Sequence, residues 1–219
     1  MRVAAVVPNR NYGRYLDRAL TSLKKQTVKL DEIIVVDGES TDNSRSVAER
    51  HGATWISTPP RRQADARNVG VRSTNCDLIL PLDADDWISP TYLARTLPMM
   101  KPGIGVVGTG LVWPHGKIQW PSPPFTLERF LAGNLVFSCS LYRKKCWEDV
   151  GGFDTAYTYE DWLFWMDVVN AGWEITFVKE ALYHHMPHSR SSSARMEQGK
   201  HEEYVDYIIQ KYRRVGCSA

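Results

Sequence analysis

Three short apolar runs, each followed by polar residues, limit what this chain can fold into more than any other feature of the sequence. They lie at residues 3–7, 33–36 and 78–82. Because polar and apolar residues do not alternate in them, each run is typical of a parallel strand buried on both faces. Apolar residues at helical spacing predict helices at 15–26 and 64–73. This alternation predicts an α/β fold, with a mostly parallel sheet and helices on both faces.

The polar segments after these strands form the first candidate site. Ligands of parallel sheets bind beyond the carboxyl ends of the strands. Because the segments 8–11, 37–40 and 83–86 all follow strands, we expect them to gather along one rim of the sheet.

The last of these segments places Asp83, Asp85 and Asp86 within four positions. Crowded carboxylates raise one another's pKa unless a cation neutralises them, which favours a divalent ion such as Mg²⁺ or Mn²⁺. A strand-end turn with solvated acids is the other interpretation. The residues alone leave both open.

The second half of the chain is less regular. Its pattern predicts helices and strands at 90–100, 104–112, 126–132, 159–171, 174–178 and 201–214. Residues 113–125 hold four prolines among aromatic residues and show no period. This segment is either a rigid connector or a loop that presents aromatic faces to a ring-shaped ligand.

The overall composition is that of a soluble globular protein, with 219 residues and a formal net charge of +2. The weak charge argues against a nucleic-acid partner. The four cysteines lack metal-ligand spacing and are expected to be reduced thiols. No apolar stretch reaches the length of a membrane span, and the N-terminal run is too short for a signal peptide. We therefore expect a cytoplasmic protein, with peripheral membrane contact left open.

Six short motifs occur along the chain in this order: Val6-Val7-Pro8-Asn9-Arg10-Asn11, Val35-Val36-Asp37-Gly38-Glu39-Ser40-Thr41-Asp42, Ala66-Arg67-Asn68-Val69-Gly70, Leu82-Asp83-Ala84-Asp85-Asp86, Gly151-Gly152-Phe153-Asp154 and Glu160-Asp161-Trp162. In this order they resemble the family 2 glycosyltransferases, over about residues 3–193. The resemblance implies a GT-A fold, a nucleotide-sugar donor, a divalent metal (Mn²⁺ or Mg²⁺) and inversion at the anomeric carbon.

The resemblance also implies how the chain is divided. One domain would contain a nucleotide-sugar-binding part (1–112), an acceptor and catalytic part (113–200), and a C-terminal helix and tail (201–219). The family favours a UDP-sugar as donor, with GDP- and dTDP-sugars open. A glycan, a lipid-linked sugar, a protein or a modified base would each suit as acceptor, and the oligomeric state is not indicated.

Five positions on the donor side carry over from the family. Pro8, Arg10 and Asp37 would line the nucleoside pocket. Arg67 would lie near the nucleotide and diphosphate, and Asp83 would face the ribose.

The metal side of the site carries over less completely. Asp85 would hold the metal that bridges the diphosphate, and Asp86 would lie close to the donor sugar. His188 is the expected third metal or diphosphate contact, because it precedes the pair Ser191 and Ser193 at the place of a family motif.

Asp161 matches the general base of the family, and Glu160 would support it. An acceptor hydroxyl must lose its proton as it attacks, and a nearby carboxylate can accept that proton. Acids at a helix start often only complement the helix dipole, which would also lower the pKa of Asp161 and weaken it as a base.

Two departures from the family pattern keep alternatives open. Gly38 stands where many members have a second aspartate, and Met186 stands where an arginine is common. The chain could therefore be an inactive nucleotide-sugar-binding module. A sugar nucleotidyltransferase would share the sheet, but it should open with a glycine-rich loop rather than Pro8-Asn9-Arg10.

Overall fold

The computed structural model describes the chain except residues 157, 189–197 and 217–219, so Ser191, Ser193 and Cys217 lie outside the described residues. The first half contains β1 (Val3–Asn9), α1 (Gly13–Lys24), β2 (Glu32–Asp37), α2 (Ser44–Arg50), β3 (Thr54–Ser57), α3 (Gln63–Arg72), β4 (Leu78–Pro81), β5 (Trp87–Ile88), α4 (Tyr92–Thr96) and the 3₁₀ helix η1 (Leu97–Met99). The second half contains β6 (Ile104–Val112), the 3₁₀ helix η2 (Pro114–Gly116), β7 (Ile118–Gln119), α5 (Leu127–Phe130), β8 (Leu141–Arg143), α6 (Lys144–Val150), α7 (Glu160–Asn170), β9 (Glu174–His184) and α8 (Gln198–Gly216).

The first four strands form the parallel part of the sheet, as predicted. Their order is β3-β2-β1-β4, and Val6 pairs with Ile34 on one side and Pro81 on the other. The carboxyl ends of these strands therefore meet at one edge, which brings the predicted polar segments to a common rim.

Beyond β4 the sheet becomes mixed. The order continues β8-β6-β9-β5, in which β6 and β9 run parallel and the other pairings are antiparallel. The predicted strand at 174–178 is longer than expected and extends to His184. β5 and α6 are too short to leave a periodic signal in the sequence.

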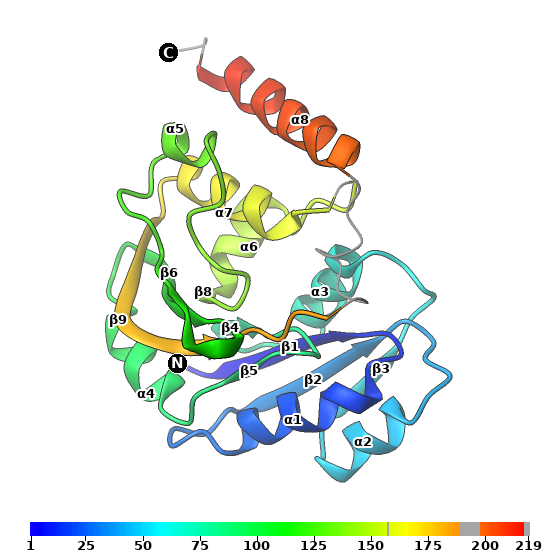
Figure 1. The fold of residues 1–219 in the computed structure, drawn as a ribbon. Coiled ribbons are helices and arrows are strands. Elements are labelled where there is room, and N and C mark those ends of the chain that lie inside the picture. The colour runs from blue at the N-terminus through cyan, green and yellow to red at the C-terminus, as the bar shows by residue number, and fades with distance from the viewer. Residues whose placement is uncertain (157, 189–197, 217–219) are drawn as a thin grey trace.

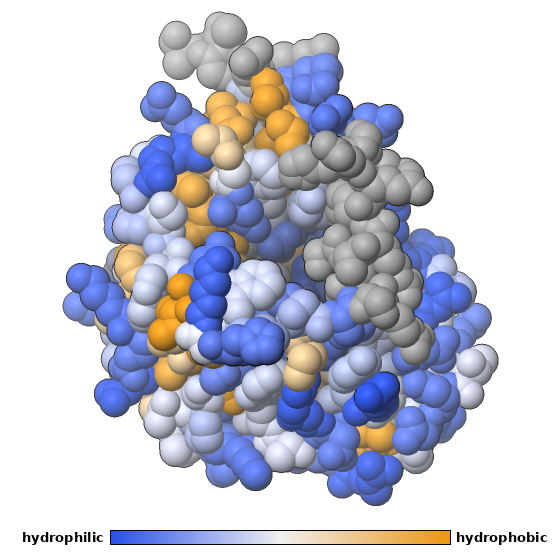
Figure 2. Space-filling model, viewed as in Figure 1, coloured by the Kyte–Doolittle hydropathy of each residue, from blue (hydrophilic) through white to orange (hydrophobic). Residues whose placement is uncertain are grey.

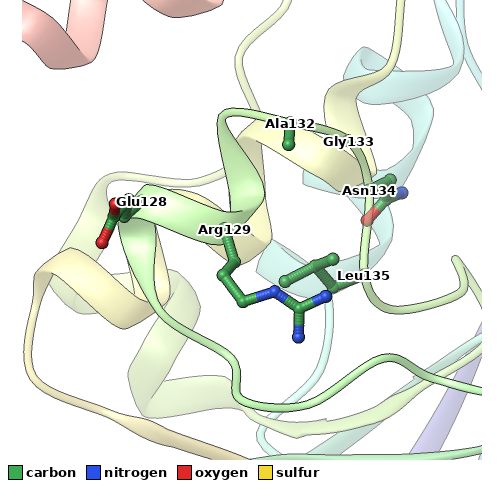
Figure 3. Close-up of a pocket in the computed structure, with 6 residues that line it drawn as sticks. All are labelled: Glu128, Arg129, Ala132, Gly133, Asn134 and Leu135. Carbon is green, nitrogen blue, oxygen red and sulfur yellow. The ribbon is translucent and has the colours of Figure 1, made fainter.

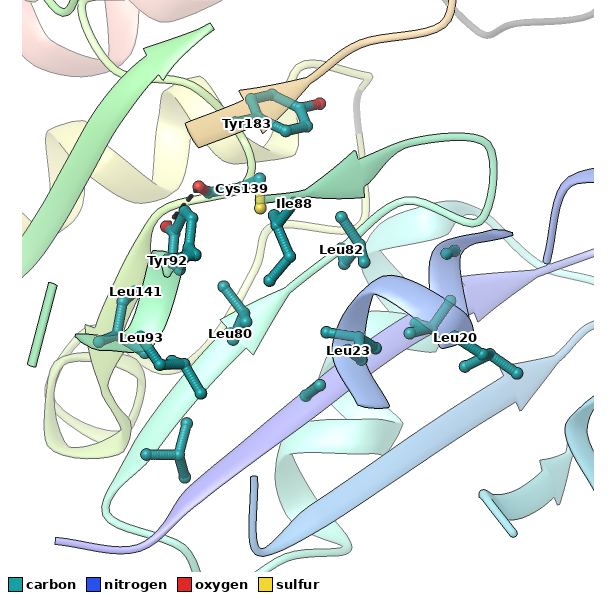
Figure 4. Close-up of a cluster of buried hydrophobic side chains, with 14 of the residues drawn as sticks. Leu20, Leu23, Leu80, Leu82, Ile88, Tyr92, Leu93, Cys139, Leu141 and Tyr183 are labelled. Carbon is teal, nitrogen blue, oxygen red and sulfur yellow. Dashed lines mark hydrogen bonds between the residues drawn. The ribbon is translucent and has the colours of Figure 1, made fainter. Parts of the chain in front are cut away.

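Helices cover both faces of the sheet and create two apolar cores (Figure 1). Val3, Ala5 and Val7 face the core under α1, α2 and α4, which Figure 4 shows in part. Ala4 and Val6 face the opposite core, against α3, α6 and α7. This division explains why the residues of β1 from Val3 to Val7 are all apolar.

Helix α3 lies very close to β1. A Cβ atom on Gly70 would come within 2.4 Å of a methyl carbon of Val6, so only glycine permits this approach. This close packing fixes the distance between α3 and β1, and it thereby fixes the position from which Arg67 of α3 reaches the site.

The face in Figure 2 is mainly hydrophilic. Its apolar residues gather toward the upper end, where α5 and α8 lie in Figure 1, and in a second group at the left edge. In the part of the chain that the structure describes, no helix combines the length and the apolar character that crossing a membrane requires.

Candidate functional site

The three carboxylates after β4 lie close together but have separate partners. Asp83 accepts a hydrogen bond from Arg67, Asp85 contacts His188, and Asp86 contacts His185. The acidic segment is therefore not a solvated turn, because each carboxylate is held by a side chain from another part of the chain.

Asp86 is the most deeply buried of the three, with 1% of its surface exposed. It accepts hydrogen bonds from the Tyr183 hydroxyl and, at 2.9 Å, from the Met186 backbone N–H. His185 Nδ1 lies 3.0 Å from Asp86 Oδ1. Burial alone would lower the pKa of His185, but the Asp86 carboxylate raises it. Asp86 thus fixes the end of β9 against the acidic segment.

Asp85 and His188 form the pair predicted to bind metal. His188 Nε2 lies 2.8 Å from Asp85 Oδ2, and the imidazole stacks on the Tyr15 ring at 4.7 Å between centroids. Burial, together with the charges of Asp86 and Asp83, raises the pKa of Asp85 to about 6. A nearby cation would stabilise the ionised form of such a carboxylate.

Arg67 joins the acidic segment to the start of α7. Its Nη2 donates to Asp83 Oδ1 at 2.7 Å, and its Nη1 donates to Glu160 Oε1 at 2.5 Å. Arg67 is only 3% exposed, and Gln63 supports Asp83 from the same helix. Burial opposes the charge of Arg67, but Asp83 and Glu160 hold its pKa above the usual value.

The residue after Arg67 fixes the segment that leads into α7. Asn68 Nδ2 donates to the Phe153 carbonyl at 2.8 Å, while its Oδ1 accepts from the Phe153 N–H at 2.9 Å. Gly152 has φ 95°, and a Cβ atom there would lie 2.8 Å from Asn68 Oδ1. The Gly-Gly-Phe-Asp motif is therefore anchored to α3 by two hydrogen bonds between Asn68 and Phe153, and this anchor positions the start of α7.

Asp161 lies in the first turn of α7, next to Glu160. Asn134 Nδ2 donates to Asp161 Oδ2 at 3.0 Å. Burial raises the pKa of Asp161 despite the charge of Arg67, and burial likewise raises the pKa of Glu160. The expectation of a lowered pKa for Asp161 is therefore wrong, because burial outweighs the charge of Arg67 and the hydrogen bonds that would lower it. A carboxylate with a raised pKa is a stronger base.

The predicted nucleoside residues lie at the ends of β1 and β2. Pro8 is buried in β1, and Asp37 is 1% exposed at the end of β2. Asp37 accepts hydrogen bonds from Asn9 Nδ2 and the Ser40 backbone N–H, both at 2.7 Å. Arg10 is exposed, and its side chain passes beside Gly38. The rim thus brings these residues together, although no hydrogen bond among the described residues joins Asp37 to the acidic segment.

Three side chains that hold the site were not predicted from the sequence: Gln63, Asn134 and Tyr183. Each acts through a contact with a residue far away in the chain, and none belongs to a recognisable motif. Only Tyr183 carried a usable signal, since it directly precedes the two adjacent histidines His184 and His185.

The donor atoms of Asp85 and His188 suit a divalent ion. Two neighbouring ligands of an octahedral ion, with bonds of about 2.1 Å, lie about 3 Å apart. Asp85 Oδ2 and His188 Nε2 lie 2.8 Å apart and share a hydrogen bond, so a metal bound by both would take the place of the shared proton. Within the described part of the chain, no three His, Cys, Asp or Glu side chains converge to form a metal site by themselves. Mg²⁺ usually takes one or two protein carboxylates and completes its shell with substrate phosphates and water.

Comparison with known families decides the class of protein. The family described as Glycosyl transferase family 2 matches residues 4–150, which is more than half of the chain. The chain belongs to glycosyl transferase family 2. The family predicted from the six motifs is thereby confirmed.

Several curated relatives of this family 2 protein are also glycosyltransferases. An uncharacterized glycosyltransferase of Nostoc sp. is 34% identical over 107 residues, which cover 46% of this chain and 33% of the relative. An uncharacterized glycosyltransferase of Haemophilus influenzae is 24% identical and covers 96% of this chain and 76% of its own length. The amylovoran biosynthesis glycosyltransferase AmsE of Erwinia amylovora is 22% identical over 94% of this chain and 81% of its own. The chain thus spans a third of the Nostoc protein's length.

Two solved structures share the fold. TarS of S. aureus (residues 1–349), in complex with UDP-GlcNAc, matches with a TM-score of 0.78 at 20% identity, over 95% of this chain and 66% of the TarS chain. The mannosyltransferase PcManGT of Pyrobaculum calidifontis, in complex with GDP-Man and Mn²⁺, matches with a TM-score of 0.68 at 18% identity, over 97% of this chain and 64% of that chain. The GT-A fold predicted for this family 2 protein is confirmed.

Proposed function

We propose that the protein transfers a sugar from a nucleoside diphosphate sugar, with UDP-sugars favoured, to an acceptor hydroxyl with inversion at the anomeric carbon. The observation that carries this proposal is the Arg67 bridge between Asp83 and Glu160, which holds the donor side and the proposed base side of the site as one unit. The complexes of TarS with UDP-GlcNAc and of PcManGT with GDP-Man support a nucleotide-sugar donor.

In the proposed reaction the acceptor oxygen forms a bond to the anomeric carbon while the bond to the diphosphate oxygen breaks. Asp161 accepts the hydroxyl proton, and its raised pKa favours this role. Attack from the face opposite the leaving group gives inversion.

On the donor side, Pro8, Arg10 and Asp37 hold the nucleoside, Asp83 faces the ribose, and Asp86 lies beside the donor sugar. Asp85 and His188 would hold Mn²⁺ or Mg²⁺, which supplies positive charge for the departing diphosphate. The complex of PcManGT with GDP-Man and Mn²⁺ supports a metal. Arg67 keeps its proposed place beside the diphosphate while it orients Asp83 and Glu160.

Nucleotide release separates this proposal from an inactive binding module. A panel of UDP-, GDP- and dTDP-sugars with Mn²⁺ and no acceptor should show slow release of one nucleoside diphosphate by the wild-type protein. A module that only binds nucleotide sugars would be stabilised by one of them against heat and would release nothing.

The metal assignment predicts the behaviour of Asp85→Ala. This variant should lose Mn²⁺-dependent affinity for UDP by about tenfold or more, because one metal ligand is gone. Calorimetric titration of UDP with and without Mn²⁺ measures the effect. Asp17→Ala, at an exposed carboxylate of α1, is the control. Equal UDP affinity for Asp85→Ala and Asp17→Ala in the presence of Mn²⁺ would refute the assignment.

The contact of Asn134 with Asp161 predicts a change in pH dependence. A donor to a carboxylate stabilises the charged form, so Asn134→Ala should raise the pKa of Asp161 further. A lost hydrogen bond to a charged group corresponds to a shift of about one pH unit. The acidic limb of the kcat profile should therefore move to higher pH by about this amount. An unchanged limb with a lower rate would mean that Asn134 acts only on packing.

A further inference from the structure

A cavity of about 570 Å³ opens beside α5, within the size range of small-molecule sites. Its lining combines polar and apolar side chains along one continuous segment, as Figure 3 shows: Glu128, Arg129, Ala132, Gly133, Asn134 and Leu135. None of these residues belongs to the six motifs of the family, and the donor side of the proposed site uses none of them.

The cavity wall is tied to the start of α7 at two points. Asn134 donates to Asp161, and the Trp162 indole N–H donates to the Phe130 carbonyl at 2.9 Å. Asn134 Oδ1 also accepts from the Val136 N–H at 3.3 Å, which sets the amide so that its NH₂ group faces Asp161. These two hydrogen bonds fix the position of the cavity relative to Asp161. A molecule bound in the cavity would lie next to Asn134 and approach Asp161 from that side.

The proline-rich segment, residues 113–125, is hydrogen-bonded to the segment that lines the cavity. The Ser122 N–H donates to the Leu135 carbonyl at 3.1 Å. Arg129 and Leu135 point into the same space below α5 in Figure 3. The Arg129 Nη1 donates to the carbonyls of Ser122, at 3.1 Å, and Pro123, and its Nη2 donates to Ser122 Oγ at 3.1 Å. Arg129 thus holds the proline-rich segment against the segment that lines the cavity.

The charges of the lining discriminate between classes of acceptor. The lining holds one guanidinium, Arg129, and one carboxylate, Glu128, so it offers an anionic acceptor no net positive charge. Both terminal nitrogens of Arg129 also donate to the proline-rich segment, and Glu128 would repel a negative charge. A neutral saccharide suits the same lining. Its hydroxyls can donate to the Glu128 carboxylate, and its C–H face can lie against Leu135 and Ala132.

We propose that this cavity is the acceptor site and that it accepts a neutral saccharide rather than an anionic one. The proposal rests on the proposed transfer reaction, because it names the class of molecule that brings the attacking hydroxyl to Asp161.

The test uses matched acceptors and the donor identified by nucleotide release. The 4-nitrophenyl glycosides of glucose, galactose, mannose and N-acetylglucosamine are the neutral probes, and 4-nitrophenyl glucuronide is the anionic match of the glucoside. We expect transfer to at least one neutral probe, and a kcat/KM for the glucuronide at least tenfold below that for the glucoside. Preference for the glucuronide, or donor release without transfer to any neutral probe, would overturn the proposal. If no donor is consumed at all, the proposed function itself fails.

Two variants test the location of the site. Ala132→Trp should fill the cavity and raise the acceptor KM at least tenfold, and Glu128→Lys should reduce the preference for the glucoside over the glucuronide. Glu174→Lys makes the same charge change at an exposed position at the start of β9 and is the control. Thermal melting and UDP titration show that each variant is folded. Wild-type acceptor kinetics in both Ala132→Trp and Glu128→Lys would place the acceptor elsewhere.

Discussion

Asp161→Asn is expected to lower the rate of sugar transfer by about a hundredfold or more, which is the range of general-base catalysis. The amide matches the carboxylate in shape but cannot accept the hydroxyl proton. The change should leave the donor side intact, since Asp161 contacts Asn134, whereas Arg67 holds Asp83 and Glu160. The measurement is kcat for transfer together with a calorimetric titration of UDP in the presence of Mn²⁺.

Asp206→Asn is the matched control, because it makes the same change at an exposed aspartate of α8. It should retain the wild-type rate. Full transfer by Asp161→Asn would remove Asp161 as the base. Loss of both transfer and UDP binding would instead assign it a structural role at the start of α7.

The parallel half of the sheet could be predicted from the sequence because its signals are local. Val3 to Val7 is apolar throughout, since β1 is covered on both faces, and the chain turns polar where the strand ends. Segments that follow parallel strands must meet at one edge. The common rim of Asp37 and the acidic segment follows from this rule.

The short strands could not be predicted in the same way. β5 and β7 have two residues each, too few to show a period, and they gain their conformation from pairing with β9 and β6. These two short strands are thus set by tertiary contacts, whereas β6 in the same part of the sheet was predicted from its own apolar run.

The interactions that turn single residues into a site are also long-range. Arg67 and Glu160 are 93 positions apart, and Asn134 and Asp161 are 27 apart. The pKa of Asp161 shows the consequence. A rule based only on its place at a helix start predicts a lowered pKa, whereas burial from the surrounding fold raises it.

Arg67→Met is expected to lower the free energy of unfolding by about 3–5 kcal/mol, the range for removing one partner of a buried ion pair. Methionine fills a similar volume but leaves Glu160, which is 7% exposed, without its counter-charge. Asp83 keeps Gln63 as a donor, so most of the loss should come from Glu160. Urea unfolding measures it, and transfer should fall as well, because Glu160 adjoins Asp161.

The stability that Arg67→Met loses through the unpaired charge of Glu160 can be separated from the stability that it loses through changed packing. Glu160→Gln in the Arg67→Met background removes the unpaired charge, so the double variant should be more stable than Arg67→Met alone, although it lacks more of the native contacts. Arg72→Met, at an exposed arginine in the last turn of the same helix, should change stability by less than about 0.5 kcal/mol. If Arg67→Met resembled Arg72→Met, the bridge would not be what holds α7 against the acidic segment. If Glu160→Gln restored no stability in the Arg67→Met background, the stability lost in Arg67→Met would come from packing. The two halves of the site would then be joined mainly by the hydrogen bonds between Asn68 and Phe153.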